Sequence, residues 1–151
     1  MGRPLIIGFG NPMREDDGLG CRAAEMMQPE DADVFTCRQL TPELAAAVSV
    51  ASIVVFLDAS VSQAAFTVAV HAVDPELTAA WSHHLTPAML VGLAARTYGA
   101  RPAAAFLISG GVGRLGWGAE LTSAAERCAT EMAAAASRLV KQRYDPTTGW
   151  R

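Results

Sequence analysis

The chain has 151 residues, of which 51% are hydrophobic and 18% are charged, and its 12 basic and 15 acidic side chains give a net charge of −3. This is the size of one compact domain, and so high an apolar content excludes general disorder. The mild acidity offers no clustered basic face to nucleic acid or to an anionic membrane. Its apolar runs are shorter than the about 20 residues that span a bilayer, so we expect neither kind of partner.

The beginning of the chain and its cysteines indicate a cytoplasmic protein. Residues 1–10 lack the apolar segment and the cleavage site of a secretion signal. The cysteines are odd in number and widely spaced, which is typical of reduced thiols rather than of a disulfide framework. We expect all of them to be small buried hydrophobic residues, at positions Cys21, Cys37 and Cys128.

Short apolar runs alternate with longer segments rich in alanine and leucine, and this alternation predicts an α/β fold. We expect a three-layer sandwich, in which a central, mostly parallel, twisted sheet of about five strands carries helices on both faces. This single domain covers residues 1–142, and residues 143–151 form a flexible tail without periodicity. The expected strands are residues 4–9, 33–39, 52–58, 66–73 and 104–109.

Capping signals mark where the helices begin. Thr41-Pro42 and Thr86-Pro87 each place a hydroxyl at an N-cap and a proline at the first helical position. Ser123 and Glu126 have the spacing of a capping box ahead of a long alanine-rich segment. We therefore expect a terminal helix that runs to about Gln142 and packs on the sheet.

The densest signal lies between the first strand and the first helix, in the sequence Gly8-Phe9-Gly10-Asn11-Pro12-Met13-Arg14-Glu15-Asp16-Asp17-Gly18-Leu19-Gly20. A glycine-rich turn in this position usually indicates a phosphate site. However, Met13 stands where the dinucleotide fingerprint needs a glycine, and the crowded carboxylates suit a cation better. A helix cap explains one of Asp16 and Asp17, but two consecutive carboxylates at a strand end favour a functional role.

A further carboxylate and two imidazoles complete a candidate metal site. Asp58 follows an apolar strand, and by itself it is compatible with a turn former. If the first and third strands are parallel neighbours, Asp17 and Asp58 lie at the same carboxyl edge of the sheet. One imidazole, from His83 or His84, would add the nitrogen ligand that a borderline divalent ion prefers.

Other catalytic schemes have less support in the sequence. The cysteines near the first two strands fall in a helix and a strand, and no G-x-S-x-G elbow exposes a serine nucleophile. The glycines of residues 110–113 are better explained by a flexible turn than by an anion cradle. His71 lies in the middle of a strand, where we expect a packing or surface residue.

Taken in chain order, these motifs resemble the hydrogenase maturation endopeptidases, which trim the C-terminal extension of the large subunit of nickel–iron hydrogenases. The likeness covers most of the chain. It rests on G-x-G-N-x-x-x-x-D-D-G-x-G at residues 8–20, Leu40-Thr41-Pro42-Glu43-Leu44, Leu57-Asp58-Ala59, Ser82-His83, and Leu115-Gly116-Trp117-Gly118 ahead of Leu121-Thr122.

The resemblance implies an α/β fold and a nickel-sensing set made of Asp17, Asp58 and His83. It favours His83 over His84, because the Ser-His step matches the family pattern. It also implies that nickel arrives with the substrate, a hydrogenase large-subunit precursor, so that no permanent cofactor is expected, although other divalent ions are expected to bind in vitro. We take Asp17 as the candidate general base and expect a monomer.

Two alternative functions are compatible with the same residues. A non-catalytic checkpoint module would hold a nickel protein without cutting it, consistent with the lack of a conventional nucleophile. A nucleotide-binding protein would use Gly8, Gly10 and the turn at residues 110–113. The mass of the product distinguishes the first alternative, and calorimetry with nucleotides distinguishes the second.

Overall fold

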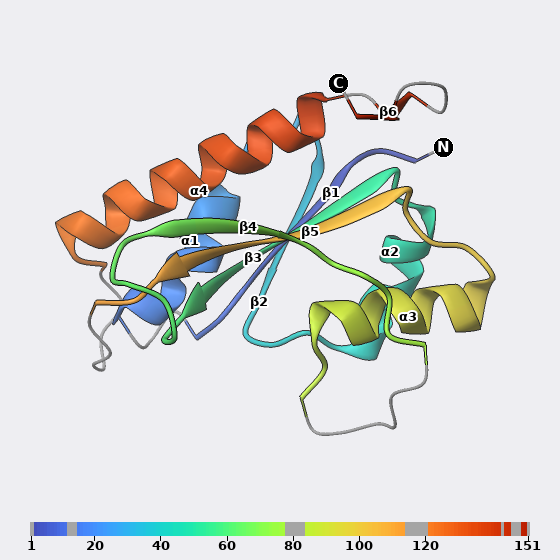
Figure 1. Ribbon diagram of the computed structural model, residues 1–151, viewed down its shortest axis with the longest axis horizontal. Helices are drawn as coiled ribbons and strands as arrows, with labels where there is room; N and C mark the ends of the chain where they lie inside the picture. The colour runs from blue at the N-terminus through green and yellow to red at the C-terminus, as the bar shows by residue number, and fades with distance from the viewer. Residues whose placement is uncertain are drawn as a thin grey trace.

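A twisted five-stranded sheet forms the centre of the molecule (Figure 1). It is seen in a computed structural model that describes residues 2–11, 15–77, 84–113, 121–142, 144–145 and 149–150. The strand order is β2-β1-β3-β5-β4, and every neighbouring pair is parallel except β4 with β5. The strands are β1 (Leu5–Phe9), β2 (Asp33–Cys37), β3 (Ile53–Ser60), β4 (Val68–Ala72) and β5 (Ala104–Gly111). The expected mostly parallel α/β sheet is thus confirmed.

Helices cover both faces of this sheet, as expected (Figure 1). On one face, α1 (Leu19–Glu25) and α4 (Ser123–Lys141) share a core with Val55 and Leu57 of β3. On the other face, α2 (Ala45–Val50) and α3 (Pro87–Tyr98) share a second core with Val54 and Phe56. Because β3 is buried on both faces, its sequence is a continuous apolar run instead of an alternating one. Two short 3-10 helices, η1 (Glu15–Gly18) and η2 (Pro42–Leu44), precede α1 and α2.

The helix starts agree with the capping signals in part. The Thr86 hydroxyl accepts the backbone N–H of Met89 at 3.2 Å, which confirms that cap. Thr41 is extended but makes no side-chain cap bond, and the 3-10 helix η2 begins after it. The prediction of Ser123 as the cap of α4 is wrong by one position, because Thr122 accepts the N–H of Ala125 at 3.1 Å.

Two strands extend further than the sequence indicated. β3 continues to Ser60, so that Asp58 lies within the strand, and β5 continues to Gly111. The interpretation of residues 110–113 as a flexible turn is therefore wrong for Gly110 and Gly111. Their backbone is paired within the sheet, and a Cβ on Gly110 would lie only 2.6 Å from Met132 Sδ. Glycine at this position allows α4 to pack closely on β5.

The cysteines, His71 and the end of the chain can be compared with the expectations in the same way. The cysteines are free, with Cys21 and Cys128 buried as expected but Cys37 only half-buried. His71 in β4 is exposed, which agrees with a surface residue. Beyond α4, β6 (Tyr144–Asp145) pairs with β7 (Gly149–Trp150), and flexibility of residues 143–151 stays a prediction. Within the described part of the chain, no helix combines the length and the apolarity required to cross a membrane.

Candidate functional site

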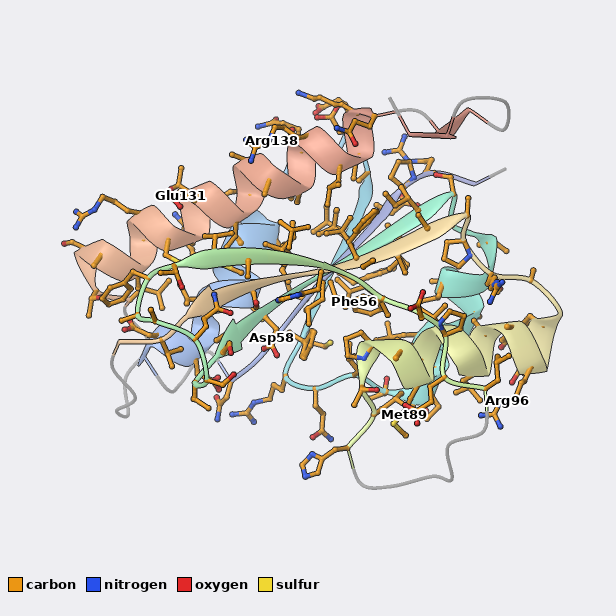
Figure 2. The ribbon with its side chains drawn as sticks, viewed as in Figure 1. Phe56, Asp58, Met89, Arg96, Glu131 and Arg138 are labelled. Atoms are coloured by element: carbon orange, nitrogen blue, oxygen red, sulfur yellow. The ribbon has the colours of Figure 1, made fainter. Side chains whose placement is uncertain are left out.

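The predicted carboxylate pair lies at the carboxyl edge of the parallel strands. β1 and β3 are parallel neighbours, with Gly8 opposite Leu57, so the residue after Leu57 lies level with the end of β1. That residue is Asp58, and Figure 2 shows it beyond Phe56, toward the end of β3. η1, which carries Asp17, contacts β3 at the same edge. The structure therefore brings Asp17 and Asp58 together, as the parallel pairing predicts.

The glycines before and after these carboxylates serve close packing. A Cβ on Gly8 would lie 2.4 Å from the carbonyl oxygen of Gly20, and a Cβ on Gly20 would lie 2.2 Å from that of Leu57. Gly10 has a φ of 143°, a conformation that other residues rarely adopt. Glycine is needed here for α1 to lie directly on β1 and β3, which accounts for the motif without a phosphate.

Asp17 is held by the backbone of its own loop. The residue is half-buried, and its Oδ2 accepts the N–H of Asn11 at 3.2 Å. The Asn11 Oδ1 in turn accepts a hydrogen bond of 3.2 Å from Arg38, which follows β2. The loop after β1 is thus tied to the end of β2, and no described residue donates a hydrogen bond to Asp17 Oδ1.

Asp16 has a different role from its neighbour. Its side chain is fully buried, and Oδ1 accepts hydrogen bonds from the hydroxyl of Thr122 at 3.2 Å and its N–H at 3.5 Å. Oδ2 is buried without a hydrogen-bond partner among the described residues. The interpretation of Asp16 or Asp17 as the cap of the first helix is wrong, because Gly18 is the N-cap of α1 and no side chain accepts a cap bond there. Asp16 instead joins η1 to the start of α4.

Asp58 is a carboxylate in an unfavourable environment for charge. Burial raises the pKa of Asp58 to about 7. The hydrogen bond from the backbone N–H of Ala59 has the opposite effect and lowers this pKa. The negative charge of Asp17 contributes a further rise. The Ala59 N–H donates to Oδ1 at 2.8 Å, and within the part of the chain that the structure describes no donor is bonded to Oδ2. Near neutral pH, Asp58 is therefore divided between its protonated and ionised forms.

A polar pair formed by the buried Ser109 and the half-buried Gln63 lies beside Asp58 and was not expected from the sequence. Ser109 of β5 is level with Asp58 in the parallel register, and it is only 5% exposed. Its hydroxyl donates to Oε1 of Gln63 at 2.7 Å. Nε2 of Gln63 donates to the carbonyl oxygens of Thr67 at 2.8 Å and of Ser109 at 3.1 Å. No sequence motif connects Gln63 with Ser109, and only the hydrogen bonds of the folded chain reveal the pair.

The histidine of the predicted set is not described by the structure. His83 lies outside the described residues, as do Ser82 and the Leu115-Gly116-Trp117-Gly118 motif. His84 is described and is exposed. Among the residues that the structure describes, no group of three or more His, Cys, Asp or Glu side chains is arranged to hold a metal. Of the predicted ligand set, the described residues thus include the carboxylate pair, Asp17 and Asp58.

The Cys21 thiol is unsuited to nucleophilic catalysis. The Cys21 Sγ lies 3.7 Å from the carbonyl oxygen of Gly8, 3.8 Å from that of Gly10 and 3.5 Å from that of Cys37. Burial raises the pKa of the Cys21 thiol to about 11, and the neighbouring Cys37 adds to this rise. The thiol is protonated at neutral pH, which agrees with its expected role as a core residue.

The fold is shared with hydrogenase maturation proteases. The protease HycI from Thermococcus kodakarensis KOD1 aligns over 92% of this chain and 92% of its own, with a TM-score of 0.70 and 20% identity. The maturating endopeptidase HybD from E. coli aligns over 92% of both chains, with a TM-score of 0.67 and 22% identity. The hydrogenase 2 maturation peptidase from Thaumarchaeota archaeon SCGC_AB-539-E09 covers 92% of this chain and 98% of its own, with a TM-score of 0.69 and 19% identity.

The sequence of the chain, unlike its fold, has no match among known families and curated proteins. At the identities above, the structural likeness establishes the fold, and it does so over most of the chain. The resemblance indicated by the motifs is therefore confirmed for the fold.

Proposed function

We propose that this chain is an endopeptidase that removes the C-terminal extension of a nickel–iron hydrogenase large-subunit precursor after nickel insertion. The observation that carries the proposal is the meeting of Asp17 and Asp58 at the carboxyl edge of the sheet. Ligands collect at this edge in open α/β folds. The fold is shared with solved structures that are named hydrogenase maturation proteases, which supports this chemistry over other uses of a carboxylate pair.

In this proposal, Asp17, Asp58 and His83 recognise a nickel ion that the substrate already holds. Each carboxylate engages one oxygen with a backbone N–H and keeps the other for the metal. Two oxygens and one imidazole nitrogen suit a borderline divalent ion. The precursor then binds more tightly once it is loaded, so that nickel insertion precedes cleavage and no resident cofactor is needed.

Peptide cleavage then requires a polarised carbonyl and an activated water. The substrate's nickel can act as the Lewis acid, and a carboxylate can act as the general base. Asp17 is the candidate for this base. The pKa of Asp58 near 7 matches what a general base needs at neutral pH, which supports Asp58 as a second candidate for the step.

The test is incubation with the large-subunit precursor of the same organism, with and without nickel, followed by mass spectrometry. We expect the wild type to shorten only the nickel-loaded precursor. Asp17→Ala and Asp58→Ala should abolish cleavage, whereas Asp74→Ala, a change at an exposed carboxylate, should cleave at the wild-type rate. Wild-type cleavage by either site variant would refute the proposal.

The same assay decides two further points. His83→Ala should abolish cleavage and His84→Ala should not, which assigns the nitrogen ligand. A precursor that is bound but keeps its full mass would favour the non-catalytic checkpoint module instead.

A further inference from the structure

The strand register places Ser109 directly beside Asp58. The two residues are register partners in the parallel strands β5 and β3, whose backbones lie about 4.8 Å apart. Their side chains share one face of the sheet, because residues two and four positions earlier in both strands belong to the core beneath α2 and α3. A serine and an aspartate placed in this way can form a direct hydrogen bond.

In the structure the Ser109 hydroxyl is bonded to Gln63 instead. A serine hydroxyl has one hydrogen to donate, and the hydrogen of Ser109 is directed at Gln63 Oε1 at 2.7 Å. Gln63 cannot easily turn away, because its amide also donates to the carbonyl oxygens of Thr67 and Ser109. If Gln63 were removed, the buried hydroxyl would need a new acceptor, since an unsatisfied donor is costly.

The segment that carries Gln63 is held in place by other contacts. The N–H of Phe66 donates to Gly111 O at 2.8 Å, that of Gly111 to Thr67 O at 2.8 Å, and that of Val112 to Ser60 O at 3.1 Å. Phe66 has a φ of 61°, a left-handed conformation that costs a non-glycine residue about 1–2 kcal/mol and that these hydrogen bonds maintain. Removal of the Gln63 side chain should therefore leave the backbone beside Asp58 where it is.

We propose that Gln63 is a positioning residue that, through Ser109, keeps the Asp58 carboxylate open to the incoming metal. The inference rests on the proposed function, in which Asp58 is a metal ligand. A hydroxyl bonded to Asp58 would compete with the metal for the same oxygen. Gln63 thus acts by keeping the Ser109 hydroxyl away from Asp58. If Gln63 gave only structural support, a second truncation at Ser109 would not restore the metal affinity.

The test measures the affinity of the full chain for Ni²⁺ by calorimetry. Asp58→Asn should lose most of the affinity. Gln63→Ala should bind Ni²⁺ about tenfold more weakly, the effect of one hydrogen bond to a charged group. Ser109→Ala should bind like the wild type, and the double variant Gln63→Ala/Ser109→Ala should recover wild-type affinity within about twofold. Gln28→Ala, at an exposed glutamine, is the matched control and should have no effect.

The outcomes separate the inference from the function on which it rests. Rescue by Ser109→Ala supports the inference, because mere loss of packing would not be repaired by a second truncation. A double variant as weak as Gln63→Ala, or a Gln63→Ala variant as tight as the wild type, overturns the inference alone. Unchanged affinity in Asp58→Asn, or no Ni²⁺ binding by the wild type, overturns the ligand role of Asp58 and the inference with it. The cleavage rates of the nickel-loaded precursor should follow the same order.

Discussion

The substitution Asp58→Asn should stabilise the folded protein while it abolishes the proposed activity. The folded state holds the Asp58 proton more tightly than the unfolded chain, because burial raises the pKa from 3.8 to about 7. The contribution of Asp58 to the free energy of unfolding is therefore fully present below about pH 4. It declines as the pH rises toward 7, where the folded carboxyl ionises. A pKa difference of about 3 corresponds to an upper limit of about 4 kcal/mol. Since Asp58 is only half-buried, solvent screening should reduce this to about 2 kcal/mol.

Asparagine removes the buried charge and retains the oxygen that accepts the Ala59 N–H at 2.8 Å. The variant should match the wild type at pH 4 and exceed it at pH 8 by about 2 kcal/mol, or about 4–8 °C in Tm. Urea unfolding across this pH range measures the difference. Asp74→Asn, at an exposed carboxylate, should show no such divergence. A difference between Asp58→Asn and the wild type that does not change with pH would refute the role assigned to burial.

Two further substitutions test the contacts that place the site. Thr122→Ala removes the cap of α4 and the donor to Asp16, and it should cost about 2 kcal/mol in urea unfolding, whereas Thr122→Ser should cost less than half as much. Gly8→Ala places a Cβ 2.4 Å from the backbone oxygen of Gly20 and should cost about 3 kcal/mol or more. Gly99→Ala, where a Cβ meets no atom within 4 Å, should cost only about 1 kcal/mol for its left-handed backbone.

The sheet and the carboxylate pair could be predicted because both follow from local patterns. The apolar run before Asp58 indicated a strand buried on both faces, and chain order favoured its parallel pairing with β1. These two inferences place Asp58 at the edge where the loop with Asp17 begins. No side-chain detail was needed for that step.

What could not be predicted depends on contacts between distant parts of the chain. Asp16 and Asp17 are identical in type and adjacent, and only the position of α4 determines that Asp16 is buried against Thr122, 106 residues away. The same contact gives the Thr122 hydroxyl a second partner, so that it caps α4 in place of the equally suitable Ser123. Gln63 and Ser109 are 46 residues apart, and the sequence contains no periodicity that connects them.

The aspartates at this edge of the sheet differ in the hydrogen-bond donors that they receive. The deeply buried Asp16 receives the hydroxyl of Thr122, although it serves the packing of α4. Among the described residues, Asp58 accepts a hydrogen bond from the backbone N–H of Ala59 alone, while the neighbouring Ser109 hydroxyl donates to Gln63. A fold selected for stability alone would direct that hydroxyl to the carboxylate, since donors lower the cost of a buried charge. The distribution instead keeps one oxygen of Asp58 available, as expected of a residue whose partner arrives with the substrate.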